Sequence, residues 1–190
     1  MKIETITIPP VPLRRFLNNY YLSSKETAIV VALIASAAPR TVVEFGVNLG
    51  KTARAILDYV TSIELYIGID VPFGYQTRLQ QQRNEVPSAA GLYVRDDERF
   101  KLLSLSYGSA ALETEDLEPI DAAFIDGDHS ALGVLADSVL ARNLMRPGGI
   151  IVWHDYRNPA VEVTGALDRL AINGWPIFSV ENTWLAFMRI

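Results

Sequence analysis

The sequence contains only two histidines, His129 and His154, and each closes a short apolar segment that is typical of a buried strand. Asp126 and Asp128 precede the first histidine, and Asp155 follows the second. Neighbouring strands of a sheet lie about 4.8 Å apart, so these five polar groups are expected to converge at one edge. A histidine titrates near neutral pH and is suited to removing a proton from a substrate. The sequence therefore predicts a functional cluster there.

A glycine-containing loop follows the first predicted parallel strand, at residues 44–52. Gly46 permits a tight turn and a close approach of the backbone, and Gly50 lets the next helix begin near the strand. Asp70 ends the following strand, where a carboxylate can accept hydrogen bonds from both ribose hydroxyls of a nucleoside. The alternative is an ordinary strand-to-helix turn with a surface aspartate. We favour the nucleoside site.

Two common nucleotide motifs fit this loop poorly. A dinucleotide site needs G-x-G-x-x-G, and Asn48 stands where the second glycine should allow contact with the pyrophosphate. A P-loop needs G-x-x-x-x-G-K-[ST], and this loop, which ends Gly50-Lys51-Thr52, is one residue short. No acid follows a strand in the arrangement of a Walker B magnesium ligand, and Asp70 suits a ribose better. Neither motif is therefore matched.

The elements around these residues alternate between strand and helix patterns. A capping box of Ser23 and Glu26 begins a helix over residues 25–38, and Pro39 ends it. Residues 147–149, Pro-Gly-Gly, are expected to turn the chain into the fifth strand. The pattern predicts an α/β fold with a doubly wound, mostly parallel sheet covered on both faces. Strands are predicted at residues 41–45, 64–70, 101–105, 121–126 and 150–154, and helices at 51–60, 75–85, 130–145 and 160–173.

Two further strands, residues 177–180 and 184–189, are separated by only three residues. Parallel strands need a crossover of about a dozen residues, so this pair is predicted to form an antiparallel hairpin at one edge of the sheet. Trp184 begins the last strand and Trp153 lies in the fifth, and we expect both in the core.

Residues 1–22 are predicted to form an N-terminal arm, and residues 23–190 a single domain. Three prolines exclude a regular helix or a central strand in the arm. Its aromatic residues, Phe16, Tyr20 and Tyr21, need a surface to pack on. The arm could therefore cover the site, form the contact of a homo-oligomer, or lie on the core.

Composition argues against several classes of protein. The 190 residues fit one domain, and 49% hydrophobic residues supply a full core. A net charge of −5, with Arg14–Arg15 as the only adjacent basic pair, argues against nucleic acid as a partner. The absence of cysteine excludes disulfides and thiolate chemistry. The first residues do not resemble a signal peptide, and the longest apolar run, residues 27–38, is too short to span a membrane, so we expect a soluble, cytoplasmic protein.

Together these motifs resemble a known family. The pattern of the loop, followed by Asp70, resembles motifs I and II of class I S-adenosylmethionine-dependent methyltransferases. The terminal hairpin is similar to the last two strands of the seven-stranded sheet of that Rossmann-like fold. The resemblance extends over residues 23–190 and implies S-adenosylmethionine as the cofactor. The cofactor site that it implies consists of Glu44, Gly46, Asn48, Gly50, Thr52, Asp70, Ser109 and Asp126.

Two longer segments resemble one methyltransferase subgroup. Residues 124–130 read FIDGDHS and residues 146–156 read RPGGIIVWHDY, similar to macrolide-sugar O-methyltransferases and cephalosporin hydroxylase-associated proteins. In metal-dependent relatives the matching positions hold a divalent ion beside a general base. The resemblance implies His129 as the base, with Asp126 in the catalytic site. The implied metal ligands are Asp126, His154 and Asp155. His154 replaces a carboxylate of those relatives, and imidazole is better tolerated by Mn²⁺ than by Mg²⁺.

The sequence thus favours an enzyme that methylates a hydroxyl of a small molecule, with a sugar as one candidate. Enzymes of this fold that methylate nucleic-acid amines usually carry an Asn/Asp-Pro-Pro-aromatic motif after the fourth strand, which is absent here. Two alternatives stay open: a nicotinamide-dependent oxidoreductase on a related sheet, and a non-catalytic S-adenosylmethionine-binding module. The missing second glycine and the final hairpin disfavour the first, and the intact acids and histidines disfavour the second.

Overall fold

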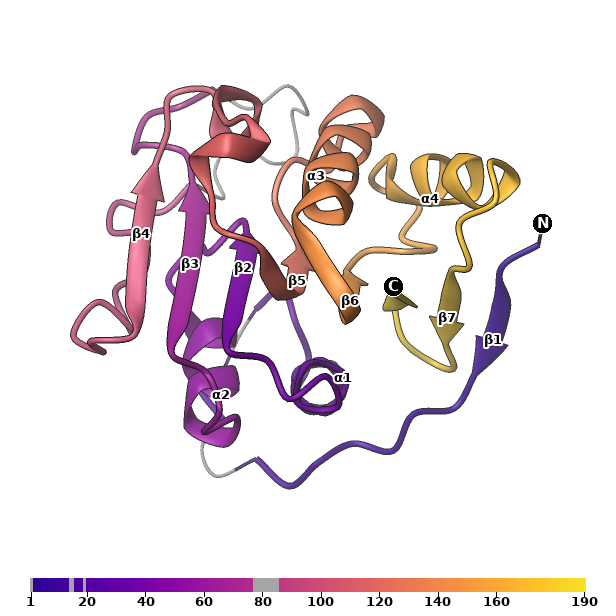
Figure 1. The fold of residues 1–190 in the computed structure, drawn as a ribbon, viewed down its shortest axis with the longest axis horizontal. Helices are drawn as coiled ribbons and strands as arrows, with labels where there is room; N and C mark the ends of the chain where they lie inside the picture. Colours follow the sequence, from indigo (N-terminus) through magenta and orange to yellow (C-terminus); the bar gives the residue numbers. More distant parts are fainter. Residues whose placement is uncertain (1, 14–15, 19, 77–85) are drawn as a thin grey trace.

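In the computed structural model, which describes residues 2–13, 16–18, 20–76 and 86–190, eight strands form one sheet (Figure 1). The order across the sheet is β1-β7-β8-β6-β5-β2-β3-β4. Strands β2 to β6 are parallel to one another, as the alternating pattern predicted. The strands are β1 (Glu4–Ile6), β2 (Thr41–Phe45), β3 (Leu65–Asp70), β4 (Phe100–Ser104), β5 (Ile120–Ile125), β6 (Met145–Trp153), β7 (Phe178–Val180) and β8 (Ala186–Arg189).

Helices cover both faces of the sheet (Figure 1). Successive residues of a strand point to opposite faces, so Val42 packs in the core beside α1 and α2, while Val43 packs in the core beside α3 and α4. The predicted α/β architecture is therefore confirmed. The helix expected at residues 75–85 falls almost wholly on residues 77–85, outside the described part of the chain. The helices are α1 (Ser24–Ala35), α2 (Lys51–Tyr59), α3 (Ala131–Leu144) and α4 (Val163–Ile172), with short 3-10 turns η2 (Gly108–Ala111) and η3 (Thr114–Asp116).

The last two strands form the predicted antiparallel hairpin, but not at the edge of the sheet. Strand β8 lies between β6 and β7 and is antiparallel to both. The edge position is taken by β1, which pairs in parallel with β7. The expected count of seven strands was therefore wrong. A three-residue strand followed by prolines carries little sequence signal, and an edge is the place where a sheet tolerates such a segment.

Strand β6 begins earlier than predicted. It starts at Met145, directly after α3, and its register with β5 jumps from Ile120↔Met145 to Ala122↔Ile150. Residues 146–149 therefore form a bulge within the strand rather than a turn before it. Gly148 adopts a φ of +85°, a conformation that glycine supplies without strain. The bulge leaves the following residues in register, so the strand still ends just before His154.

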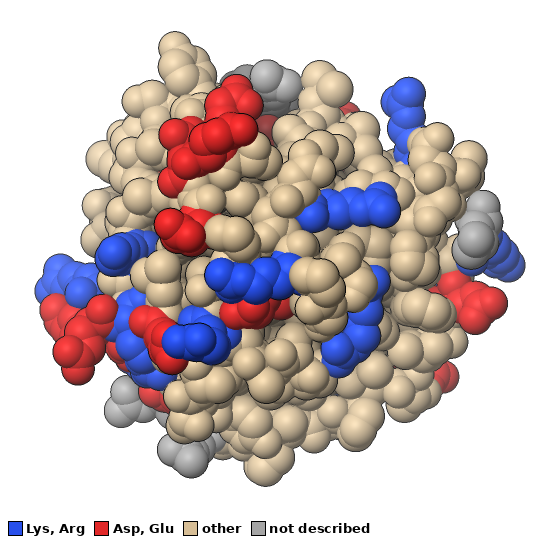
Figure 2. Space-filling view, in the orientation of Figure 1, with Lys and Arg blue, Asp and Glu red and all other residues tan. Residues whose placement is uncertain are grey.

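Charged side chains are dispersed on the face shown in Figure 2, where basic and acidic residues lie among uncharged ones. Within the described residues, no helix is long and apolar enough to cross a membrane.

Candidate active site

A cavity of about 740 Å³ lies at the carboxyl ends of the parallel strands. Its wall includes Gly46 and Asn48 after β2, Asp70 at the end of β3, Asp126 after β5 and His154 after β6. These residues are far apart in the sequence, and they meet because parallel strands all end at the same edge of a sheet. The cavity is thus where the fold predicts a ligand site.

The loop after β2 is held against its neighbours by its own backbone. A Cβ at Gly46 would lie 2.3 Å from the backbone oxygen of Asp126, and Gly46 has a φ of +85°, so only glycine fits there. The carboxylate of Asp70 accepts hydrogen bonds from the backbone N–H of Asn48 and from that of Val71, both at 2.7 Å. Burial raises the pKa of Asp70, although these donors oppose the shift. Each carboxylate oxygen has a second lone pair, so Asp70 can also accept from ligand hydroxyls.

The predicted cofactor-binding residues divide into two groups. Glu44 is buried and accepts a hydrogen bond from the Tyr66 hydroxyl at 2.9 Å, and burial raises its pKa well above the ordinary value. Gly50 is the N-cap of α2, where a Cβ would lie 2.7 Å from Val94, so it permits close packing behind the loop. Glu44 and Gly50 therefore support the loop without lining the cavity. The predicted residues that do line it are Gly46, Asn48, Thr52, Asp70, Ser109 and Asp126.

The two histidines and two of the aspartates meet as predicted. Oδ1 of Asp126 lies 3.2 Å from Nε2 of His129 and 3.2 Å from Nδ1 of His154. Oδ2 of Asp155 lies 3.3 Å and 3.5 Å from the same two nitrogens. Asp128 lines the cavity beside them, but its carboxylate accepts a hydrogen bond from the backbone N–H of Ser130. The cluster thus consists of two imidazoles between two carboxylates.

The charges of this cluster stabilise one another. Burial alone would lower the pKa of His154, but Asp126 and Asp155 favour its charged form and raise the pKa to about 10. His129 is partly buried, and its contacts with Asp126 and Asp155 outweigh the effect of burial and raise its pKa. The pKa of Asp126 is held well below its usual range by the two histidines, against the opposing effect of burial. The imidazoles of His129 and His154 can therefore hold a proton beside the ionised carboxylate of Asp126.

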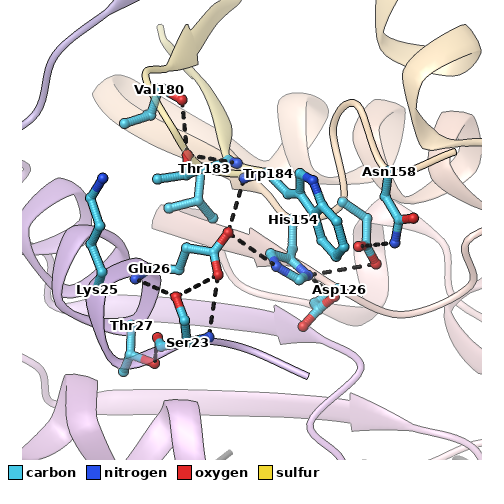
Figure 3. Close-up of polar contacts among 12 residues, drawn as sticks. Ser23, Lys25, Glu26, Thr27, Asp126, His154, Asn158, Val180, Thr183 and Trp184 are labelled. Atoms are coloured by element: carbon cyan, nitrogen blue, oxygen red, sulfur yellow. Dashed lines mark hydrogen bonds and ion pairs between the residues drawn. The ribbon is translucent and has the colours of Figure 1, made fainter. Parts of the chain in front are cut away.

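Glu26, known from the sequence only as a capping residue, faces the cluster from α1 (Figure 3). The predicted capping box is confirmed, because Ser23 accepts from the Glu26 backbone while the Glu26 carboxylate accepts from the Ser23 backbone. Oε1 of the same carboxylate accepts a hydrogen bond from the backbone N–H of Trp184 at 2.9 Å and lies 3.9 Å from Nε2 of His154. That nitrogen is buried and makes no hydrogen bond within the described residues. Glu26 therefore places its carboxyl group on the Nε2 side of His154.

Aromatic side chains outside the predicted site residues also line the cavity. Trp184 was expected in the core, but it is 43% exposed and its ring centroid lies 6.3 Å from that of His154. Tyr20 and Tyr21 of the arm line the same cavity. Trp153, by contrast, is fully buried as predicted and donates a hydrogen bond to Ser138. Trp184 differs because it stands in the connection between β7 and β8, which ends at the cavity.

The donor atoms of the cluster suit a divalent cation. One ligand atom each from Asp126, His154 and Asp155 lies within 4.8 Å of the others, which a single ion can bridge. Nδ1 is the His154 nitrogen that faces the carboxylates, whereas Nε2 faces Glu26. Two carboxylate oxygens with one imidazole nitrogen favour Mn²⁺ over Mg²⁺. The predicted ligand set therefore fits a metal ion, and the metal remains a prediction.

The chain is similar in sequence pattern and in fold to known methyltransferases. Residues 43–156, more than half of the chain, match the family model described as a methyltransferase domain. Cofactor-bound Rv0187 from MTB aligns with a TM-score of 0.64 and 18% identity over 92% of this chain and 83% of that chain. The O-methyltransferase from Bacillus cereus in complex with SAH gives 0.60 and 14% over 90% and 84%. SAH-bound PaMTH1 from Podospora anserina gives 0.62 and 15% over 89% and 80%. No curated protein matches the sequence.

Proposed function

Because this chain belongs to the methyltransferase domain family, we propose that it transfers the methyl group of S-adenosylmethionine to a hydroxyl of a small molecule. O-Methyltransferases of the same fold, including the protein from Bacillus cereus with bound SAH, support this proposal. Membership in a family of methyltransferases argues against the alternative that the sequence left open, a nicotinamide-dependent oxidoreductase.

One observation carries the proposal: the carboxylate of Asp70, which we assign to a ribose, and the pair of His129 and Asp126 line the same cavity. Asp70, at the end of β3, lines the cavity, and we assign it the ribose hydroxyls. His129 and Asp126 line the wall after β5. A methyltransferase needs both parts, because methyl transfer from a sulfonium is an in-line displacement that requires the acceptor to be oriented and deprotonated.

His129 is assigned the proton transfer. As the acceptor oxygen attacks the methyl carbon and the bond from that carbon to sulfur breaks, the hydroxyl proton passes to the imidazole of His129. The imidazolium that forms keeps Nε2 beside Oδ1 of Asp126 at 3.2 Å and Oδ2 of Asp155 at 3.3 Å, so its charge is stabilised where it develops. Trp184 offers a flat surface for the acceptor beside His154. A ring-shaped acceptor, such as a sugar, fits this surface.

A divalent cation would be held by Asp126, His154 and Asp155. When bound, it would lower the pKa of the acceptor hydroxyl and so make the proton transfer easier. Glu26 would hold His154 with Nδ1 toward the cation, because its carboxylate favours a proton on Nε2.

Replacing Asp70 with alanine is expected to weaken binding of S-adenosylhomocysteine by about 1.5–3 kcal/mol, the contribution of hydrogen bonds to a charged group. This corresponds to a rise in Kd of roughly 10- to 150-fold, measured by calorimetry. Glu64→Ala is the matched control, since Glu64 directly precedes the same strand but is exposed and pairs with Arg40. Equal affinities of wild type and Asp70→Ala would remove Asp70 from the site. Binding of NAD in place of S-adenosylhomocysteine would overturn the proposed function.

Metal removal is expected to lower turnover, and added Mn²⁺ to restore it. Exhaustive dialysis against EDTA followed by calorimetric titration with Mn²⁺ measures binding independently of activity. Asp155→Asn should bind Mn²⁺ more weakly and lose the stimulation, because a neutral amide replaces one of the two anionic ligands. Full activity of the dialysed enzyme would refute the cation, and the base mechanism of His129 would then stand alone.

A further inference from the structure

The turn after β6 carries Asp155 in an unusual backbone conformation. Asp155 has a φ of +61° and Arg157 a φ of +73°, and neither residue is a glycine. Left-handed conformations are costly for residues with a side chain, and they persist where surrounding contacts impose them, often at ligand sites. The backbone N–H of Asn158 closes the turn by donating to the carbonyl oxygen of Asp155 at 3.1 Å. The turn therefore holds Asp155 and Asn158 next to each other.

Neighbouring elements fix this turn from two sides. The backbone N–H of Tyr156 donates to the carbonyl oxygen of Trp184, in the connection between β7 and β8, at 2.9 Å. The backbone N–H of Arg157 donates to the Thr164 hydroxyl at 2.8 Å, and the Tyr156 hydroxyl donates to Asp168 at 3.0 Å, so both contacts reach α4. The turn should therefore keep its shape when one of its other side chains is shortened.

Within the turn, the amide of Asn158 engages one oxygen of the Asp155 carboxylate. Nδ2 of Asn158 donates to Oδ1 of Asp155 at 2.6 Å, drawn as a dashed line from Asn158 in Figure 3. Oδ1 of Asn158 accepts from the backbone N–H of Ala160 at 3.0 Å, which fixes the amide with its donor toward Asp155. The other carboxylate oxygen, Oδ2, lies 3.3 Å from Nε2 of His129 and 3.5 Å from Nδ1 of His154. Asn158 thus engages Oδ1, and Oδ2 is the oxygen turned toward the imidazoles.

We propose that Asn158 is a positioning residue that makes Asp155 bind a divalent cation through one oxygen, and that it thereby selects Mn²⁺ over Ca²⁺. This inference rests on the proposed function, because it takes Asp126, His154 and Asp155 to hold the cation. Ca²⁺ takes about six to eight oxygen ligands and often uses both oxygens of a carboxylate. A carboxylate restricted to one oxygen denies Ca²⁺ such a ligand, whereas Mn²⁺ accepts the smaller set of an octahedral site.

The test measures the affinities for Mn²⁺ and Ca²⁺ by calorimetry, on protein freed of metal with EDTA and then of EDTA. Loss of a partner that orients a ligand costs about 10- to 100-fold in metal affinity, so Asn158→Ala should bind Mn²⁺ at least about tenfold more weakly than the wild type. Its affinity for Ca²⁺ should stay equal or increase, because Oδ1 of Asp155 becomes available as a further ligand. The preference for Mn²⁺ should therefore fall by at least about tenfold.

Asn173→Ala is the matched control for this measurement. The Asn173 amide also donates to an oxygen nearby in the chain, the backbone carbonyl of Arg169 at 2.8 Å, and Asn173 is not among the described residues of the cavity wall. This variant should keep the wild-type preference. A general loss of structure would weaken the binding of both ions alike, so the ratio of the two affinities reports the coordination by Asp155.

The outcomes separate this inference from the proposed function. Equal affinities of the wild type for Mn²⁺ and Ca²⁺ would overturn the role of Asn158 without requiring any variant to fold. An unchanged ratio of the two affinities in Asn158→Ala would overturn it as well. Failure of the wild type to bind Mn²⁺ would overturn the cation of the proposed function, and this inference with it.

Discussion

The variant His129→Ala is expected to turn over about 10²–10⁴-fold more slowly than the wild type, with unchanged affinity for S-adenosylhomocysteine. The loss is large because His129 is the imidazole after β5 whose protonated form is stabilised by both Asp126 and Asp155. Cofactor affinity should be preserved because Asp70 and the loop after β2 are held by their own hydrogen bonds. Initial rates and calorimetry measure the two quantities separately.

Added imidazole provides the control for this prediction. If His129 removes a proton, imidazole in the buffer should restore part of the lost turnover, whereas a purely structural histidine would not be replaced in this way. Wild-type turnover in a folded His129→Ala enzyme would exclude the histidine as the base. A loss of cofactor affinity equal to the loss of turnover would assign it to binding instead.

The sequence predicted the cluster because each of its members stands at the end of an apolar strand. Strand ends are local features, and the order of parallel strands then brings Asp126 and His154 together. The family pattern also identified the loop, although it did not separate Gly46, which lines the cavity, from Glu44, which supports it from below. Glu44 lies within β2 with its side chain buried against Tyr66, whereas Gly46 lies in the loop after the strand, and the family pattern does not separate these two environments.

The features that the sequence missed all depend on contacts between distant segments. Glu26 looks like an ordinary capping residue until α1 is placed beside the end of β6. Trp184 looks like a strand residue, but β8 begins only at Ala186 and leaves the ring at the cavity. Strand β1 exists because β7 offers it an unpaired edge.

Removing the carboxylate of Asp126 is expected to have the largest effect on stability. Asp126 contacts both histidines, and in metal-free protein His154 is held as a cation between it and Asp155. Taking away one partner of a buried ion pair costs about 3–5 kcal/mol, because the other charge is left without compensation. Asp126→Ala in EDTA should therefore unfold at a clearly lower urea concentration than the wild type. Glu64→Ala removes an exposed ion pair and should leave the midpoint unchanged.

The difference in the free energy of unfolding between wild type and Asp126→Ala should depend on pH, and this dependence identifies the cause of the difference. The pKa of His154 is raised from an ordinary value of about 6.5 to about 10, so the stability that it contributes is complete below pH 6.5 and lost as the pH rises toward 10. The pKa of Asp126 is lowered, so its contribution is present above its ordinary value of about 4 and lost as the pH falls below it. The difference in free energy of unfolding between wild type and Asp126→Ala should thus be largest between about pH 4 and 6.5 and should become smaller at lower and at higher pH. Urea unfolding at pH 3.5, 5.5 and about 9.5 measures this difference. A difference that is constant across this range would mean that Asp126 stabilises the fold by packing rather than by pairing with His154.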